Sequence, residues 1–179
     1  MKIFLNQKQI SRIKKIKLGE LGRKLDVNFK LMGNTLDVEG SALSEYTAAN
    51  IIKALATGFS MQQALLLRDV DYMLQKINIK DYIRPSRIKQ IKARLIGKKG
   101  KVLKTLSMLS DCALKLEDNT INILGTTKNV DTATSAILSL IRGSKYSSVY
   151  RILEQKPQFF EDLGLKPIMP PKKKQKRKN

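Results

Sequence analysis

The sequence predicts an α+β protein in which one module with the order β-α-α-β-β-α occurs twice. A shift of 85 positions superposes two parts of the chain, short segments alternate apolar and polar residues as in hairpins, and glycines end helical segments at equivalent places. Each module has about 70 to 80 residues, a size at which small domains can fold alone. The sheet of each module is expected to have three strands packed on helices.

The repeat is clearest around the predicted hairpins. It aligns residues 25–31 with residues 110–116, and no gap is needed between Ile10 and Gly58. It also pairs two sets of glycines, Gly40 with Gly125 and Gly58 with Gly143. The hairpin and the helix after it are therefore expected to coincide in the two modules.

The same elements are expected in both modules. The strands are predicted at 2–5, 27–31 and 35–39 in the first and at 74–79, 113–116 and 120–124 in the second. The helices are predicted within 10–25, 44–57, 88–110 and 129–142. Ser44 and Asn129 are the predicted N-caps of the helices that Gly58 and Gly143 end. An apolar helix, Phe59–Tyr72, is predicted to connect the modules and pack them together.

These elements divide the chain into three parts, residues 1–72, 73–156 and 157–179. The last part, with Pro170-Pro171 and the run Lys172–Lys178, is predicted to be a disordered basic tail. Such a tail adds phosphate contacts without sequence preference, and it is a nuclear-localisation signal only if the source is eukaryotic.

Charge is distributed unevenly along the chain. The formal net charge is +20, and residues 84–156 contribute +10 of it with 15 basic and five acidic side chains. A field of this sign favours a polyanionic partner, either nucleic acid or an acidic membrane surface. No apolar run reaches the length of a spanning helix and no signal peptide opens the chain, so a cytoplasmic protein without a membrane partner is expected.

Composition excludes several kinds of chemistry. The chain has one cysteine, Cys112, and no histidine, so an internal disulfide, a Cys/His zinc site and a Ser-His or Cys-His nucleophile pair are impossible. The acidic residues are scattered, and Asp69 with Asp71 is better explained by a helix border than by a metal site. Cys112 is expected to be a buried thiol. We expect neither an enzyme nor a cofactor.

The candidate site is the tetrapeptide Gly97-Lys98-Lys99-Gly100. It lies within Arg84–Lys104, which carries nine basic residues and no acidic one. Two glycines let the backbone turn tightly and leave room for a sugar-phosphate strand, and the lysines between them would meet its charge. About one G-x-x-G is expected by chance in a chain of this length, so the context decides.

That context resembles a KH domain, since Leu95–Gly100 lies between the first two helices of a β-α-α-β-β-α module. The tandem arrangement and the stretch Gly143–Glu154 are similar to the archaeal members of a ribosome-assembly family, the partner-of-Nob-one family. The resemblance covers residues 1 to about 156. It implies a type I KH fold in which the G-x-x-G loop clamps single-stranded RNA, and a factor that holds the 3′ end of small-subunit ribosomal RNA. It also implies the Nob-one endonuclease and the alpha subunit of translation initiation factor two as partners.

The predicted RNA contacts all lie in the second module. They are the loop and its neighbours on both sides: Arg87, Lys92, Arg94, Leu95, Ile96, Gly97, Lys98, Lys99, Gly100, Lys101 and Lys104. Two other interpretations remain for these residues. The apolar ones fit a hydrophobic core better than a groove floor, and the lysines also fit a solvated face.

The first module lacks this loop. The repeat aligns it with residues 12–15, Arg-Ile-Lys-Lys, which contain no glycine. A second match, Gly19-Glu20-Leu21-Gly22, lies seven positions out of register and is interpreted as a coincidence. We therefore expect the second module to bind RNA and the first to be structural or to bind protein. The alternative function is an adaptor in which both modules bind proteins and the charge gives only non-specific attachment to ribosomes.

Overall fold

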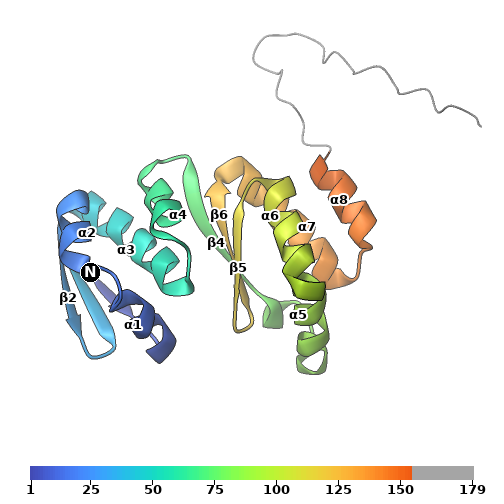
Figure 1. Cartoon of the computed structure of the whole chain (residues 1–179), viewed down its shortest axis with the longest axis horizontal. Coiled ribbons are helices and arrows are strands. Elements are labelled where there is room, and N and C mark those ends of the chain that lie inside the picture. Colours follow the sequence, from blue (N-terminus) through green and yellow to red (C-terminus); the bar gives the residue numbers. More distant parts are fainter. Residues whose placement is uncertain (155–179) are drawn as a thin grey trace, which may run out of the picture.

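The computed structural model describes residues 1–154 and contains two three-stranded sheets and eight α-helices (Figure 1). Residues 1–71 are here called the N-terminal half and residues 72–154 the C-terminal half. The predicted basic tail, residues 157–179, lies outside the described residues, as does the predicted end of the second module at residue 156.

The N-terminal half follows the predicted order of elements. These are β1 (Lys2–Phe4), α1 (Gln7–Ile13), α2 (Leu18–Leu25), β2 (Val27–Met32), β3 (Thr35–Gly40) and α3 (Ala42–Thr57). The strands are antiparallel in the order β1-β3-β2. Strand β3 alternates as predicted: Leu36 and Val38 are buried, while Glu39 is exposed. One face of this sheet is therefore packed on helices and the other is solvated.

The C-terminal half repeats this arrangement and adds one α-helix at its end and three 3-10 turns. Its elements are β4 (Tyr72–Asn78), α5 (Ile88–Ile96), α6 (Lys101–Ser110), β5 (Ala113–Glu117), β6 (Thr120–Thr126), α7 (Thr127–Arg142) and α8 (Tyr146–Glu154), with 3-10 turns at Ile79–Asp81, Pro85–Arg87 and Lys98–Gly100. The sheet order is β4-β6-β5, which matches the first sheet position for position. Cys112 is 3% exposed, as predicted for a structural thiol.

The 85-residue repeat holds in the backbone as well. Asp26 and Asp111 end α2 and α6 in the left-handed conformation, with φ of 53° in both. Helices α3 and α7 have equivalent bounds, and each is ended by a left-handed glycine, Gly58 or Gly143. The loop between the first two helices is where the halves differ.

The predicted N-caps are wrong by three residues. Helix α3 begins after Ser41, whose hydroxyl accepts a hydrogen bond from the Ser44 N–H at 3.2 Å, and α7 begins after Thr126. Both helices start directly where the strand ladder ends, so the earlier hydroxyl residue takes the cap position. Asn129 instead donates a hydrogen bond to Asp111.

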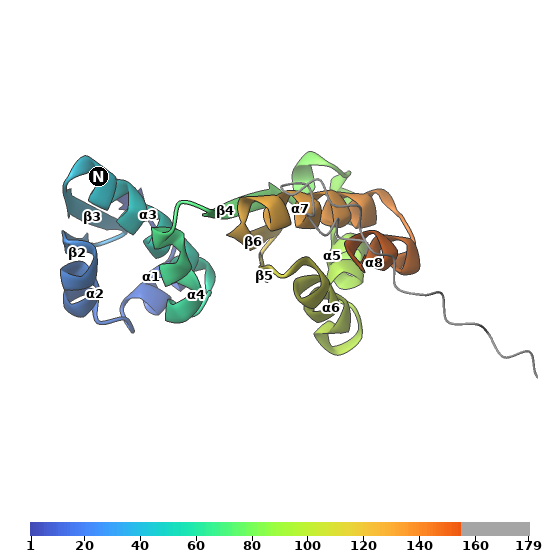
Figure 2. The same ribbon diagram turned by 90° about the horizontal axis from the view of Figure 1, so that it is seen from above.

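The connecting helix is shorter than predicted. Helix α4 spans Met61–Leu65 and continues as a 3-10 turn, Leu66–Arg68, before the chain enters β4 at Tyr72. Ser60 and Gln63 form a capping box at its start. In two perpendicular views α4 lies on the side of the N-terminal half that faces the second sheet (Figures 1 and 2).

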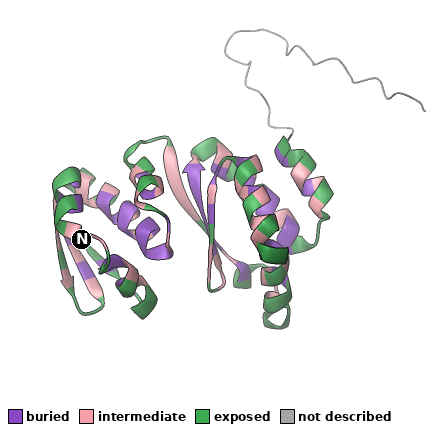
Figure 3. Cartoon of the chain, in the orientation of Figure 1, coloured by how far each residue is buried: buried purple, intermediate pink, exposed green. Residues whose placement is uncertain are grey.

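The N-terminal half covers the second face of the second sheet. Strand β6 is buried from Ile121 to Gly125, because Ile121 and Ile123 pack into the core of the C-terminal half while Leu124 packs into that of the N-terminal half (Figure 3). Tyr72, Leu74 and Ala113 join Leu124 there. The two sheets thus differ in that the second also packs on its other face, around Leu124, against the N-terminal half.

Candidate nucleic-acid interface

The Gly97–Gly100 loop connects α5 to α6 with an unusual backbone. Gly97, Lys99 and Gly100 have φ of 71°, 54° and 75°, all in the left-handed range. Gly97 ends α5 and Gly100 is the N-cap of α6, with the 3-10 turn Lys98–Gly100 between them. The loop thus places two lysines directly before the N-terminus of α6, whose first backbone N–H groups have no partner inside the helix.

Gly97 and Gly100 require glycine for different physical reasons. A Cβ atom on Gly97 would lie 2.3 Å from Cγ2 of Val102, so the loop packs directly on α6 at this point. A Cβ atom on Gly100 would meet nothing within 4 Å. Gly97 therefore shapes the loop, whereas Gly100 leaves open space in front of the helix N-terminus, where a ligand backbone can approach.

A groove of about 420 Å³ begins at Gly100 and runs between α6 and β5. Helix α6 lines one side with Leu103, Lys104, Ser107 and Met108, β5 lines the other with Ala113, Leu114 and Lys115, and Gln63 of α4 also borders it. Met108 is 70% exposed, and Leu114 belongs mainly to the core. The groove is thus apolar along its length and basic at its rim.

Electrostatics and hydrogen-bonding capacity both suit a single-stranded polyanion. Within residues 1–154 no ion pair involves Lys98, Lys99, Lys101, Lys104 or Lys115, which are all exposed. Strand β5 is at the edge of its sheet, so one row of its backbone N–H and C=O groups is unpaired by neighbouring strands. Lysine side chains that can contact phosphates and β5 backbone groups that can hydrogen-bond to bases therefore flank the same groove.

The structure does not bring all of the predicted contacts to the groove. Leu95 is 1% exposed and is a core residue, and Ile96 is 37% exposed but does not line the groove. Arg94 turns toward α8: it lies over the Tyr146 ring at 5.2 Å and donates hydrogen bonds to the carbonyls of Gly143 and Ser144. Arg94 therefore ties α5 to the α7–α8 junction. Of the other two predicted contacts, Arg87 is exposed and Lys92 half-buried.

Most residues that line the groove are absent from the predicted contacts, and Lys115 and Gln63 show two different reasons. Lys115 occupies an exposed position of the predicted strand, and its alternation with Leu114 and Leu116 was a usable signal. Gln63 comes from the N-terminal half, and nothing in the sequence indicates that α4 borders a groove formed by residues 100–115.

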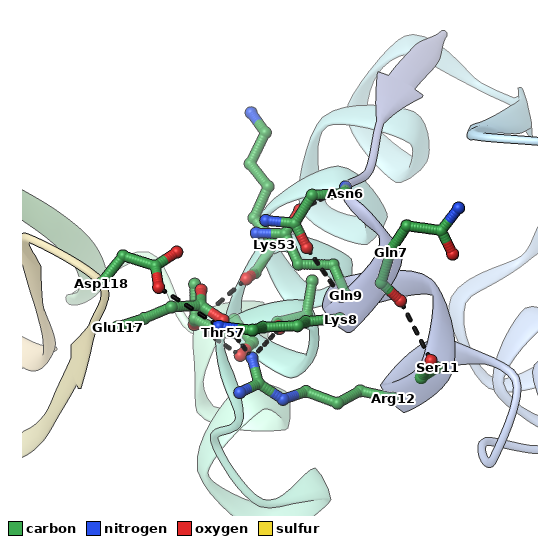
Figure 4. A network of polar contacts seen from close by, with 12 residues as sticks. Asn6, Gln7, Lys8, Gln9, Ser11, Arg12, Lys53, Thr57, Glu117 and Asp118 are labelled. Carbon is green, nitrogen blue, oxygen red and sulfur yellow. Dashed lines mark hydrogen bonds and ion pairs between the residues drawn. The ribbon is translucent and has the colours of Figure 1, made fainter.

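The counterpart of the loop in the N-terminal half has another role (Figure 4). No residue between 12 and 17 has a left-handed backbone. The guanidinium of Arg12 pairs with the carboxylate of Glu117 and donates a hydrogen bond of 2.6 Å to the carbonyl of Ala56, while Lys8 pairs with Asp118 at 3.4 Å. These residues join α1 and α3 to the β5–β6 hairpin. Gly19 and Gly22 lie inside α2 and form no loop.

One charged group at this junction is perturbed. The side chain of Lys76 on β4 is exposed, but partial desolvation, reinforced by the nearby Lys53, lowers its pKa, and Glu117 acts in the opposite direction. Lys53 lies on α3, so the perturbation arises where the halves meet.

Two other kinds of site can be assessed in the described part of the chain. Residues 1–154 contain no group of three or more His, Cys, Asp or Glu side chains placed to hold a metal ion. None of their helices combines the length and apolar character that a membrane crossing needs.

Comparison with known proteins assigns the class. A family model described as a eukaryotic type KH domain, type I, matches residues 73–158. The C-terminal half is thus a type I KH domain. The chain is 31% identical over 152 residues to the KH domain-containing protein MJ0443 of Methanocaldococcus jannaschii, a match that covers 82% of this chain and 66% of the relative. It is 32% identical over 128 residues to the RNA-binding protein PNO1 of Oryzias latipes, which covers 70% of this chain and 51% of the relative.

Solved structures share the fold of this chain. Dim2p from Pyrococcus horikoshii is similar with a TM-score of 0.77 and 25% identity, over 87% of this chain and 98% of that one. A similar chain in an a/eIF2α–aDim2p–rRNA complex from the same organism has a TM-score of 0.77 and 24% identity, over 87% of this chain and 92% of that one. The chain belongs to the partner-of-Nob-one (PNO1) family of KH-domain proteins. It spans 66% and 51% of the two curated relatives named above.

Proposed function

We propose that this protein binds single-stranded RNA in the groove between α6 and β5 and acts in ribosome biogenesis by holding the 3′ end of small-subunit ribosomal RNA. The observation that carries the proposal is the loop itself. Its left-handed backbone leaves Gly100 open at the mouth of an apolar groove, and Lys98, Lys99, Lys101 and Lys104 around it are unpaired within residues 1–154. The role is binding, without catalysis.

The phosphates and the bases of the RNA contact different parts of this site. The phosphates lie against the loop, where the first N–H groups of α6 and the lysines supply positive potential. The bases lie along Leu103, Ser107 and Met108, with their edges toward the unpaired backbone groups of β5. Because a duplex would bury its base edges, this arrangement selects an unpaired strand.

The names of the relatives support the biological setting. PNO1 of Oryzias latipes is called an RNA-binding protein, and a relative from Phaeosphaeria nodorum, 31% identical over 135 residues, is called a pre-rRNA-processing protein. The similar Pyrococcus chain was crystallised with rRNA and a/eIF2α. We extend these associations to this chain as part of the proposal, with the Nob-one endonuclease as a further predicted partner and the cytoplasm as its predicted location.

We further propose that the chain consists of two KH domains, residues 1–72 and 73–156, and that the first one binds protein. Exposed apolar side chains on α3 and after α4 favour this role: Leu43 is 75% exposed, Tyr46 63% and Val70 95%, around a hollow of about 480 Å³. A surface of this kind suits a protein partner better than RNA, and the alpha subunit of translation initiation factor two is the candidate. An adaptor with only non-specific RNA affinity is the alternative function.

The proposal is tested by measuring affinity for a pyrimidine-rich oligonucleotide from the ribosomal RNA 3′ end and for a scrambled strand of the same composition. We expect tighter binding to the 3′-end strand, and the double variant Lys98→Asp, Lys99→Asp should lose at least about tenfold in affinity because two phosphate contacts become repulsive. Unchanged affinity in the variant would show that the loop is not the clamp. Equal affinity for both strands, with only a salt dependence, would favour the adaptor. Crosslinking to pre-ribosomal RNA would then map the contacts.

A further inference from the structure

The groove between α6 and β5 continues toward the N-terminal half. At Met108 it meets a second hollow of about 380 Å³, and the two share Gln63, Ser107, Met108 and Ala113 as lining residues. From Gly100 to Met108 the chain rises by about 12 Å along α6, at about 1.5 Å per residue. A strand that lies along the groove from the loop is therefore directed into this second hollow.

We propose that the second hollow, with Gln63 of α4, holds a nucleobase beyond those clamped next to the loop, so that the N-terminal half takes part directly in RNA binding. This inference rests on the proposed function. Gln63 then contacts RNA although it lies outside the KH domain to which the Gly97–Gly100 loop belongs.

The orientation of Gln63 is fixed by the start of its own helix. Its Oε1 accepts a hydrogen bond from the Ser60 N–H at 3.1 Å, while its backbone N–H donates to the Ser60 hydroxyl at 3.2 Å. The acceptor of the side-chain amide is thus occupied. Its Nε2 group has no hydrogen-bond partner within residues 1–154 and remains as a donor, which suits the carbonyl oxygens and ring nitrogens on base edges.

The lining of the second hollow favours a base over a phosphate. It includes the carboxylate of Asp111, which would repel a phosphate, together with the half-buried ring of Tyr72 and the side chain of Asn129. Aromatic and amide side chains of this kind stack on bases or hydrogen-bond to their edges. The two hollows thus differ in chemistry, with phosphate-binding lysines around the first and base-binding groups in the second.

The position of Gln63 relative to α6 is held by the junction between the halves. The Arg12–Glu117 pair and the burial of Leu124 in the core of the N-terminal half hold this half, and α4 with it, against the second sheet. Because these contacts are all within the protein, the protein itself keeps the extended groove in shape, and little ordering has to accompany binding.

An oligonucleotide length series tests the inference. Affinities of the full chain are measured for a four-nucleotide strand, which spans the loop clamp, and for a seven-nucleotide strand that extends it at either end. We expect Gln63→Ala to weaken binding of the longer strand about fivefold and binding of the shorter strand clearly less, because Gln63 is only at the border of the first groove. The matched control is Gln62→Ala, because Gln62 is an exposed neighbour that lines neither hollow.

A second variant separates the RNA contact from the helix cap. Gln63→Glu retains an acceptor for the Ser60 N–H but loses both donors, so it should weaken the longer strand at least as much as Gln63→Ala while the Tm stays at the wild-type value. If the wild-type chain binds both strands and neither Gln63 variant changes the affinity, or both strands weaken equally, the inference is wrong and the loop clamp stands. If the wild-type chain binds neither strand, the proposed function fails with it.

Discussion

The connection between the first two helices has a different structure in each half of this chain. In the C-terminal half, residues 97–100 form an open, left-handed loop that leaves a helix N-terminus accessible. In the N-terminal half the repeat places Arg12–Lys15 there, with no left-handed residue, and Arg12 instead joins the two halves through Glu117. A repeated scaffold has thus kept its hairpins and helices while one copy of the loop became part of an intramolecular interface.

The largest expected effect comes from placing a carboxylate in the open loop. Gly100→Asp should fold, because aspartate already adopts the left-handed conformation at Asp26, Asp111 and Asp118 and suits a helix N-cap. Its charge would face the RNA phosphates, and we expect about a hundredfold loss of RNA affinity in a titration at fixed salt. Lys14→Asp in the N-terminal half is the control and should cost no more than about twofold. Equal losses would mean that the two positions do not differ in function.

The second prediction distinguishes the two loop glycines by stability. Gly97→Ala combines a left-handed backbone with a clash against Val102, so we expect a loss of about 3 kcal/mol in the free energy of unfolding. Gly100→Ala meets open space, and its φ of 75° and ψ of 9° lie in the αL region, which a side chain tolerates better than the φ of 71° and ψ of 177° of Gly97, so about 1 kcal/mol is expected. Denaturant titrations of both variants measure the difference. Equal losses would contradict the packing of Gly97 on α6.

The third prediction concerns the interface that the N-terminal loop forms. A double-mutant cycle with Arg12→Ala and Glu117→Ala should give a coupling energy of about 1 kcal/mol, because Glu117 is only 11% exposed while Arg12 is 39% exposed. The equivalent cycle for the exposed Lys8–Asp118 pair should give close to zero. A coupling near zero for the first pair would show that Arg12 does not hold the halves together.

The smallest expected effect is a pH dependence of the covered sheet. The pKa of Lys76 is lowered in the folded protein, so the unfolded chain binds more protons between that pKa and 10.5, and stability rises with pH in this window. Lys76→Met should therefore raise the Tm slightly at neutral pH, and the advantage over wild type should shrink as pH approaches 10.5. Thermal melts of the variant and of the wild type across this pH range measure the effect.

Local pattern was sufficient to predict the hairpins, the helices that end at Gly58 and Gly143, and the position of the loop. These features depend on alternation and on glycine, which act over a few residues. The N-caps of α3 and α7 were misplaced because several hydroxyl and amide residues precede each helix, and the end of the strand ladder decides which one is used.

Contacts between distant segments could not be predicted in the same way. Gln63 borders the groove, Arg94 lies on Tyr146 and Arg12 pairs with Glu117 only because of how elements pack in three dimensions. Each of these side chains is polar and would be solvated in an isolated helix, so its sequence position carries no signal. Leu95 is the opposite case: its position next to the loop predicted an RNA contact, but its side chain packs in the hydrophobic core.

The double-sided burial of β6 couples the folding of the two halves. Leu124, Leu74 and Ala113 lie against the N-terminal half, and they would face water if that half unfolded. Unfolding of one half therefore exposes apolar surface of the other half to water, which costs free energy. This cost favours a single cooperative transition of the two halves over stepwise melting. By the same reasoning, a C-terminal half produced alone would expose the apolar patch of Tyr72, Leu74, Ala113 and Leu124 and tend to associate with other copies of itself.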